Sequence, residues 1–421
     1  MKKKVLIIGG GFGGLSAAKF LGQYPELFDV QLYDRRNYHL FQPLLYQVAT
    51  AALSPSDIAV PIRSILSRYK NISVLLEEVL KINPHNKTIT TAFGEVNYDY
   101  LISACGSRHS YFGKDEWEEF APGLKTLEMA TEIRRRILTS FERAEIETNS
   151  DEKQASMNFV VIGGGPTGVE TAGAIREIAT NTLIKDFRNI NPAETKVYLV
   201  EAGPKILATF SEDLGRAGEE DLEKIGVIVM TNSRVVNVDD KKVTITSQNE
   251  TFDIPARTVI WAAGVKASTL NQSLDSKLDR SGRVIINHDL TLPGFEHTFI
   301  IGDQANYQIN DKSSLPGLAP VAIQQGRHAA RNIVLLESGK RVRNFVYFDK
   351  GQMATIGTKL AVMQFKGIES HGFIAWISWL FVHIMYLIGF KNRVIVMFQW
   401  FWSYITYNRG TRLIMDKDWK K

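Results

Sequence analysis

Cysteine is almost absent from this chain of 421 residues, which contains only Cys105. A single thiol cannot form a disulfide within the chain, so a fold held together by disulfides is excluded. Any mechanism that cycles a pair of cysteines is excluded for the same reason. Cys105 has no obvious activating neighbour in the sequence, and we interpret it as a small buried residue and not as a nucleophile.

A strong excess of charge is also lacking. The 50 basic and 45 acidic residues leave a net charge of +5, and no arginine-rich run with interleaved aromatic residues is present, so we expect no nucleic-acid partner. The apolar and charged fractions are those of a globular protein, and the length allows two or three domains. Residues 1–4 run directly into an apolar segment, so we expect no signal peptide and a location in the cytoplasm.

A glycine motif opens the chain. Val5–Ile8 predicts a buried strand and Leu15–Leu21 a helix, and the glycines between them have G-x-G-x-x-G spacing. Such a turn lets the backbone approach a pyrophosphate, which rests on the helix N-terminus. The turn residues that we assign to the ligand are Gly9, Gly11, Phe12, Gly13 and Gly14. Asp34 ends the next strand at the distance typical of a ribose-binding acid, although an ordinary glycine turn is the alternative.

The motif recurs about 150 residues later, after the predicted strand Asn158–Ile162. A second acid, Glu201, follows the strand Lys196–Val200, and 181–195 is interpreted as an insertion after a long helix. Glu201 can accept a hydrogen bond from the 2′-hydroxyl of NADH and would repel the 2′-phosphate of NADPH, so we favour NADH. Two such motifs predict two dinucleotides, a flavin and a nicotinamide. The second motif assigns to NADH Gly163, Gly165, Pro166, Thr167 and Gly168.

Three further segments are predicted to contact the flavin. The segment 35–49 is irregular and apolar, and we expect it to lie along a flat aromatic ligand, with Gln42 and Pro43 as contacts; plain packing is the alternative. The strand within 98–107 ends in a tight turn at Gly106. Asp303 follows the apolar strand 298–301 and can hold a ribityl hydroxyl, unless this Gly-Asp pair is a simple surface turn.

The remaining segments suggest how the domains are connected. Residues 125–148 predict a charged helical connector, 148–155 an exposed linker, and 227–259 a three-stranded meander. The run 258–265 closes the second domain and contributes Ala263 and Gly264 to the NADH site. The predicted domains are a discontinuous first domain at 1–124 and 286–340, a connector at 125–155, an inserted second domain at 156–285 and a C-terminal region at 341–421.

The two motifs, Gly302-Asp303 and the strip 319–325 together resemble the two-dinucleotide-binding flavoproteins, and among them the type II NADH:quinone oxidoreductases, over essentially the whole chain. The resemblance implies an α/β fold with two Rossmann-like domains, FAD in the first and NADH in the second. It also implies a respiratory enzyme that passes two electrons from NADH through FAD to a membrane quinone, either ubiquinone or menaquinone.

The resemblance also suggests residues near the reacting groups. It places Ala322 at the FAD, Gln324 and Gln325 at the quinone pocket, and Glu170 near the nicotinamide and flavin. The usual family strip has glutamine where Pro320 stands, which puts in doubt any hydrogen bond assigned to that position. A cap or a surface contact is the alternative role for the two glutamines, and a helix-dipole acid is the alternative for Glu170.

The C-terminal tail is rich in aromatic residues. The segment 372–390 has no formal charge, and 394–407 is flanked by Lys391, Arg393, Arg409 and Arg412. Aromatic residues with flanking cations predict an amphipathic helix pair that anchors the protein in the headgroup region. A transmembrane span and a dimer interface are the alternatives. His383 has no partner ligands at suitable spacing, so we expect no metal site.

These features predict a monotopic enzyme on the cytoplasmic side of the inner membrane, with a homodimer as one possible assembly. Without a bundle of ionisable transmembrane helices it should not pump protons. A sulfide:quinone oxidoreductase is excluded because it needs paired cysteines. A soluble ferredoxin or rubredoxin reductase and a binding flavoprotein that resembles apoptosis-inducing factor are the alternative functions.

Overall fold

The structure is a computed structural model that describes residues 1–310, 313–406 and 410–415. The chain forms two compact units, each assembled from three stretches. The first unit contains Met1–Leu40, Ala59–Arg108 and Val265–Asp349, and the second contains Phe41–Ile58, His109–Gly264 and Lys350–Lys421. Both units have a parallel sheet with helices, so the predicted α/β class is confirmed. The domain boundaries given above remain predictions.

The first unit is built on a six-stranded sheet in the order β20-β21-β9-β1-β2-β5. β1 lies in the middle and pairs in parallel with β2 and β9. Its residues Val5–Ile7 are fully buried, as expected for a central strand of a parallel sheet that is covered on both faces. The strand bounds are Lys3–Ile8 (β1), Phe28–Asp34 (β2), Ile72–Leu76 (β5), Tyr100–Ser103 (β9), Thr291–Leu292 (β20) and Phe295–Ile300 (β21).

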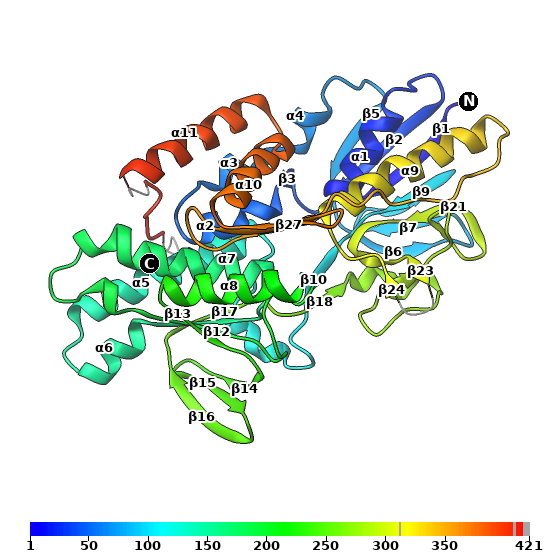
Figure 1. Ribbon diagram of the computed structural model, residues 1–421. Coiled ribbons are helices and arrows are strands. Elements are labelled where there is room, and N and C mark those ends of the chain that lie inside the picture. Colours follow the sequence, from blue (N-terminus) through cyan, green and yellow to red (C-terminus); the bar gives the residue numbers. More distant parts are fainter. Residues whose placement is uncertain (311–312, 407–409, 416–421) are drawn as a thin grey trace. The chain divides into compact units, whose positions relative to one another are not determined.

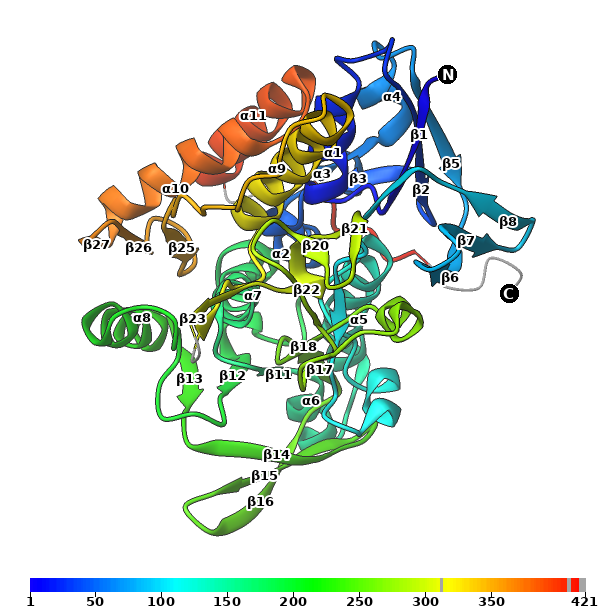
Figure 2. The same cartoon turned by 90° about the vertical axis from the view of Figure 1, so that its right-hand side faces the viewer.

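Helices α1 (Phe12–Leu21) and α9 (Ala319–Glu337) lie side by side in this unit (Figures 1 and 2). Their contact is close because Gly326 faces the backbone of Gly13, where an added Cβ would lie 2.1 Å from the carbonyl oxygen. α9 begins at Ala319, directly before Pro320. Proline suits the first turn of a helix, where its missing N–H is not needed.

The second unit contains the parallel sheet β13-β12-β11-β17 and the antiparallel meander β14-β15-β16. The meander is shorter than predicted, because the strand at residues 227–230 joins the parallel sheet. Both predicted strands around the second glycine motif are confirmed. The bounds are Asn158–Ile162 (β11), Lys196–Val200 (β12), Val227–Met230 (β13), Ser233–Val238 (β14), Lys242–Ser247 (β15), Glu250–Pro255 (β16) and Thr258–Trp261 (β17).

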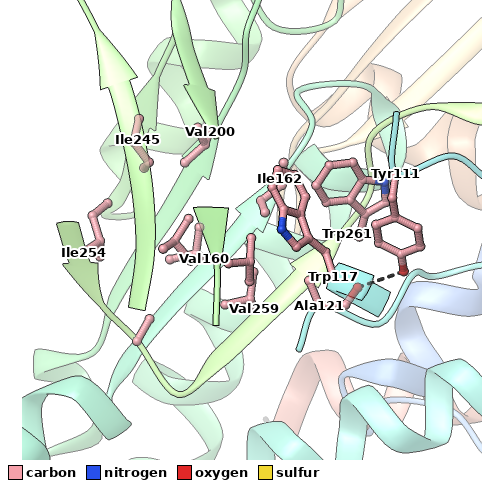
Figure 3. Close-up of a cluster of buried hydrophobic side chains, with 13 residues drawn as sticks. Tyr111, Trp117, Ala121, Val160, Ile162, Val200, Ile245, Ile254, Val259 and Trp261 are labelled. Carbon is pink, nitrogen blue, oxygen red and sulfur yellow. Dashed lines mark hydrogen bonds between the residues drawn. The ribbon is translucent and has the colours of Figure 1, made fainter. Parts of the chain in front are cut away.

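Figure 3 shows part of the core of this unit, where the indole of Trp261 packs against Tyr111 and Trp117. The ring centroids of the two pairs are 4.9 and 5.8 Å apart. The Tyr111 hydroxyl donates to the carbonyl oxygen of Ala121 at 2.9 Å, so the buried phenol keeps a hydrogen bond. These aromatic residues fix the loop 110–121 against the end of β17.

Two predictions about local structure are wrong. Residues 148–155 were expected to be a linker, but α6 (Ser150–Ser156) is a helix, capped by the Asn149 side chain and with Asp151 and Glu152 in its first turn. The segment 35–49 is not irregular throughout, because a 3₁₀ turn at Gln42–Leu44 leads into the buried helix α2 (Leu45–Ala49). The predicted connector is confirmed as α5 (Leu127–Ile146).

The C-terminal part of the second unit begins with a three-stranded antiparallel sheet that the sequence analysis did not predict. Two helices follow it, α10 (Phe373–Tyr386) and α11 (Phe390–Thr406), which carry many exposed apolar residues. No helix within 1–310, 313–406 and 410–415 is long and apolar enough to cross a membrane. Tyr407 and Arg409 of the predicted anchor lie outside the described residues. The strands are Gln352–Thr355 (β25), Ala361–Phe365 (β26) and Ile368–His371 (β27).

Candidate functional site

The first glycine turn has the geometry of a phosphate-binding turn. Gly9 has φ +98°, and a Cβ there would lie 2.4 Å from the carbonyl oxygen of Ala104. At Gly14 a Cβ would lie 1.8 Å from the carbonyl oxygen of Gly9, so neither position accepts a side chain. Gly11 is different, because a Cβ there would meet no described atom within 4 Å. Its open side, next to Phe12 and the first N–H groups of α1, suits the approach of an anion.

Asp34 lies beside this turn at the end of β2, as predicted. Its Oδ2 atom accepts a hydrogen bond from the Gly10 N–H at 2.6 Å, and its Oδ1 atom accepts one from the Arg36 N–H at 2.7 Å. Burial raises the pKa of Asp34, and these two backbone hydrogen bonds oppose the shift. The carboxyl is thereby fixed against the turn, where a ribose of a bound dinucleotide would lie.

A second group of predicted site residues lies close together in the first unit, at the Gly302-Asp303 turn. The Ser107 hydroxyl donates to Oδ2 of Asp303 at 2.8 Å, which brings the turn after Gly106 to the Gly302-Asp303 turn. Gly302 has φ +74°, and its N–H donates to Oε1 of Gln325 at 2.7 Å. The Gln325 side chain is 1% exposed, so its amide is part of the interior.

Ser107 was not among the residues predicted for the site. The only signal in the sequence was its position directly after Gly106 at the end of a buried strand. Ala322 packs on the same turn, because a Cβ added to Gly302 would lie 3.6 Å from the Cβ of Ala322. Gly302, Asp303 and Ala322 therefore form one surface at the end of β21.

The second glycine turn repeats the first in the second unit. Gly163 has φ +111°, and a Cβ there would lie 2.8 Å from the backbone of Ala262 and Ala263. A Cβ at Gly168 would lie 1.8 Å from the Gly163 carbonyl oxygen, whereas Gly165 is open. Pro166 begins α7 (Pro166–Glu177), Thr167 is exposed in its first turn, and Gly264 ends the neighbouring strand connection with φ +67°.

Glu201 occupies the position that Asp34 has in the first turn. Its Oε2 atom accepts a hydrogen bond from the Gly164 N–H at 2.7 Å, and its Oε1 atom accepts one from the Gly203 N–H at 2.6 Å. These two hydrogen bonds could not be predicted from the sequence, where only the spacing between the acid and the glycines is apparent. The carboxylate therefore supports the turn and also presents negative charge where a nicotinamide nucleotide would place its ribose.

Glu170 is a buried acid on α7 and is only 9% exposed. Desolvation raises its pKa to about 8, and the Thr355 N–H, 3.4 Å from Oε1, and the Trp379 indole lower it. The carboxyl is therefore protonated at neutral pH. Its predicted role near the nicotinamide and flavin, and the alternative role as a helix-dipole acid, remain predictions.

Gln324 and Gln42 have contacts that the sequence did not predict. The Gln324 amide forms two hydrogen bonds with the backbone of Phe348, at 2.9 and 3.0 Å. Gln42, next to Pro43, donates to the carbonyl oxygen of Lys125 at 3.0 Å within the second unit. These bonds hold neighbouring segments in place, and the predicted roles of Gln324 at the quinone and of Gln42 and Pro43 at the flavin remain predictions.

Two titratable residues outside the motifs are neutral. Burial raises the pKa of the Cys105 thiol to about 11, which favours the protonated, unreactive form. Desolvation lowers the pKa of His383 to about 4, and its ring stacks on Trp379 at a centroid distance of 4.0 Å. Within the part of the chain that the structure describes, no group of three or more His, Cys, Asp or Glu residues could hold a metal ion.

Comparison with known proteins first defines the class. Residues 3–326 match the family model described as pyridine nucleotide-disulphide oxidoreductase. The chain is thus a two-dinucleotide flavoprotein, although its single cysteine excludes disulfide chemistry. Residues 350–407 match a second model, described as the NDH2 C-terminal domain.

Similarity to individual proteins shows to which family within this class the chain belongs. The chain is 42% identical to the type II NADH:quinone oxidoreductase NdhA of Mycobacterium tuberculosis, with 99% of this chain and 90% of that protein covered. It is 28% identical to the type II NADH:quinone oxidoreductase of Staphylococcus saprophyticus, with 88% and 92% covered. The chain therefore belongs to the type II NADH:quinone oxidoreductase family.

Solved structures agree in fold. NDH2 from Plasmodium falciparum, solved in complex with NADH, superimposes with a TM-score of 0.88 at 21% identity, covering 99% of this chain and all of that one. A sulfide:quinone oxidoreductase from Aquifex aeolicus has a TM-score of 0.73 at 21% identity, with 93% and 91% covered. At these identities the likeness establishes the fold, and the function rests on the closer relatives.

Proposed function

We propose that this enzyme oxidises NADH and reduces a membrane quinone, with FAD as the intermediate carrier and without pumping protons. Family membership supports the reaction class and both cofactors. One structural observation carries the proposal: the chain builds two glycine turns, each closed by a carboxylate, from Asp34 in the first unit and Glu201 in the second. Two dinucleotide sites on one chain suit a flavin enzyme that uses a nicotinamide.

FAD, when bound, supplies the chemistry that accepts a hydride and releases two electrons. The residues that would hold it in the first unit fit an extended dinucleotide. The turn around Gly11 is open to a pyrophosphate, Asp34 is fixed beside this turn where it would accept from a ribose, and Asp303 is held by Ser107 near the end of a parallel strand. Gln325 holds the Gly302 N–H and therefore sets the position of Asp303.

NADH is bound by the second turn. Gly165 leaves the backbone open to a pyrophosphate, and Glu201 would accept a hydrogen bond from the ribose 2′-hydroxyl. A 2′-phosphate would meet this carboxylate at close range, and the two like charges would repel each other. The enzyme therefore prefers NADH to NADPH.

The reaction NADH + H⁺ + quinone → NAD⁺ + quinol consumes one proton. Glu170 holds a proton at neutral pH because its buried carboxyl has a pKa of about 8. A carboxylic acid with a pKa close to the working pH is well suited to proton donation. We therefore assign to Glu170, in the second unit, the role of supplying this proton. Gln324 and Gln325, in the first unit, are assigned to the quinone region on the basis of the family resemblance.

The enzyme works at the membrane surface, on the cytoplasmic side of the inner membrane. The support is the apolar surface of α10 and α11, which includes Phe381, Phe398, Phe401 and Trp402, each more than half exposed. Such helices bind by inserting apolar side chains into the boundary between headgroups and acyl chains. A soluble ferredoxin or rubredoxin reductase would have no use for this surface, and the weak net charge of +5 gives no support to a flavoprotein that binds nucleic acid.

The test is to mix purified protein with NADH and a short-chain quinone. We expect a yellow protein that oxidises NADH rapidly only when quinone is present, with one quinol formed per NADH. A protein whose flavin is reduced slowly and is not reoxidised by quinone would contradict the proposal. A protein that lacks flavin and does not bind it when offered would contradict the assignment of the first turn.

A further inference from the structure

A row of buried polar side chains in the second unit leads from helix α11 towards Glu170. The Trp400 indole N–H donates to Oε1 of Gln47 at 2.7 Å, and the Gln47 amide donates to the Tyr46 hydroxyl at 3.0 Å. The Tyr46 hydroxyl in turn bonds to the Thr355 hydroxyl at 3.0 Å. The Thr355 N–H then lies 3.4 Å from Oε1 of Glu170.

Every member of this row is buried. The exposed fractions are 6% for Trp400 and Gln47, 7% for Tyr46, 3% for Thr355 and 9% for Glu170. An unsatisfied polar group at such burial is costly, so each bond constrains the next side chain. The members come from four elements, α11, α2, β25 and α7, and α2 lies beside α7 in the ribbon (Figure 1).

We propose that Tyr46, Gln47, Thr355 and Trp400 are positioning residues that hold Glu170 in place and make its protonation depend on how α11 is seated. The proposal rests on the role of Glu170 given above but assigns new roles to the four residues. Helix α11 would then be more than an anchor. Its buried edge, which carries Trp400, would adjust the acid, while its exposed side, which carries Trp402, faces outward.

Among the described residues, the groups that shift the pKa of Glu170 are uncharged. The titratable groups in contact with the row or acting on it include Tyr46 itself, Tyr404 of α11, which acts on Tyr46, and His383 of α10, whose ring stacks on Trp379. Trp379 is 1% exposed, and its indole N–H lowers the pKa of Glu170 although it has no hydrogen bond of regular geometry among the described residues. Of these two groups, the backbone N–H of Thr355 lowers the pKa of Glu170 more than the indole does. The position of Thr355 should therefore determine the pKa of Glu170.

The row is not a proton path between Tyr46 and Glu170. Tyr46 bonds to the Thr355 side chain, whereas Glu170 faces the Thr355 backbone N–H, and a proton cannot pass from one to the other along this route. The connection is therefore mechanical. If the Thr355 hydroxyl loses its partner, β25 shifts and the N–H moves away from Glu170. The pKa of Glu170 should then rise, because a contribution that lowers it is lost.

The test measures the carboxyl directly in the FAD-loaded enzyme. The infrared C=O band of protonated Glu170, identified by its absence in Glu170→Gln, is titrated in wild type, Tyr46→Phe, Thr355→Val and Trp400→Phe. We expect the midpoint to move up by about 0.5 to 1 pH unit in all three variants, as the loss of one hydrogen bond to a carboxylate allows. The alkaline limb of the quinone-reduction profile should move by the same amount.

Matched controls separate positioning from general damage. Trp402→Phe makes the same change on the exposed side of α11, and Thr355→Ser keeps the hydroxyl, so both should retain the wild-type midpoint. Unchanged midpoints in Tyr46→Phe, Thr355→Val and Trp400→Phe would overturn the proposal, as would a downward shift or an equal shift in Trp402→Phe. Because the band reports the carboxyl without turnover, failure here is distinct from failure of the proposed reaction.

Discussion

Gln325 holds the backbone N–H of Gly302 at 2.7 Å through its Oε1 atom, and it does so from a side chain that is almost fully buried. Its neighbour Gln324 uses both ends of its amide on the backbone of Phe348. Two adjacent glutamines on one helix therefore have different tasks. One fixes the turn that carries Asp303, and the other fixes the chain that follows α9.

This difference makes a first prediction. Gln325→Ala should weaken FAD retention, because the Gly302 N–H loses its acceptor and Asp303 is no longer held; one lost buried hydrogen bond corresponds to about 1–3 kcal/mol. Gln324→Ala should leave flavin content unchanged. Flavin absorbance per protein after dialysis is the measurement. Equal flavin loss in both variants would contradict the division of roles.

A second prediction concerns the nucleotide. Glu201→Gln should raise the KM for NADH by about 10-fold, because a neutral amide accepts the ribose hydroxyl less strongly and supports only part of the Gly164 and Gly203 contacts. Glu201→Arg should also improve use of NADPH relative to NADH. Steady-state kinetics with both nucleotides would check this, and unchanged values in both variants would remove the assignment.

A third prediction concerns pH. Quinone reduction should fall as pH rises through about 8, because Glu170 loses its proton there, and Glu170→Gln should lack this limb and be about 100-fold slower. The folded pKa is raised from 4.5, so the folded state binds more protons than the unfolded state between pH 4.5 and 8. As pH rises from 4.5 to 8, the free energy of unfolding of the wild type should therefore fall relative to that of Glu170→Gln. A parallel Tm profile for the two proteins would contradict the raised pKa.

A fourth prediction tests the membrane surface. Phe381→Asp and Phe401→Asp should each lower partitioning into lipid vesicles by about 10- to 100-fold, because each removes a large apolar side chain from the lipid boundary. Phe93→Asp, at an exposed phenylalanine of the first unit, is the control. If vesicle binding persists in the helix variants while a dimer seen by sedimentation dissociates, the surface is an interface between copies.

A fifth prediction separates two glycines of the first turn. Gly14→Ala should prevent stable folding of the turn, because its Cβ would lie 1.8 Å from the Gly9 carbonyl oxygen. Gly11→Ala should keep the thermal stability of the flavin-free protein, because Gly11 has φ −70° and open space beside it. It should still weaken FAD binding by obstructing the pyrophosphate. Normal flavin content in Gly11→Ala would contradict the assignment.

Much of the fold could be predicted because its signals are local. The apolar run at Val5–Ile8, the two glycine spacings and the acids at Asp34 and Glu201 each depend on a short stretch of sequence. The helix α6 was missed because the charged residues at 151–153 suggested solvent exposure. The Asn149 side chain caps the helix, and the acids Asp151 and Glu152 are favourable in its first turn.

The contacts within the site could not be predicted in the same way. Tyr46 and Thr355 are 309 positions apart, and Trp400 and Gln47 are 353 apart, so only the folded chain brings these partners together. Glu170 could be recognised by its place after the second glycine turn, but its pKa depends on its burial and on contacts from Thr355 of β25 and Trp379 of α10, which are distant in sequence. The β25–β27 sheet has no strong sequence pattern, and without it Thr355 could not be connected to the acid.

The solitary cysteine has a practical consequence. Its thiol is held in the protonated form, with a pKa of about 11, and sits 3.5 Å from the Ser103 hydroxyl. Maleimide dyes and spin labels react with thiolates, so Cys105 should remain unmodified at neutral pH. A cysteine introduced at Trp402 could then be labelled selectively in the natural background, which would let the depth of α11 in a lipid bilayer be read by fluorescence quenching.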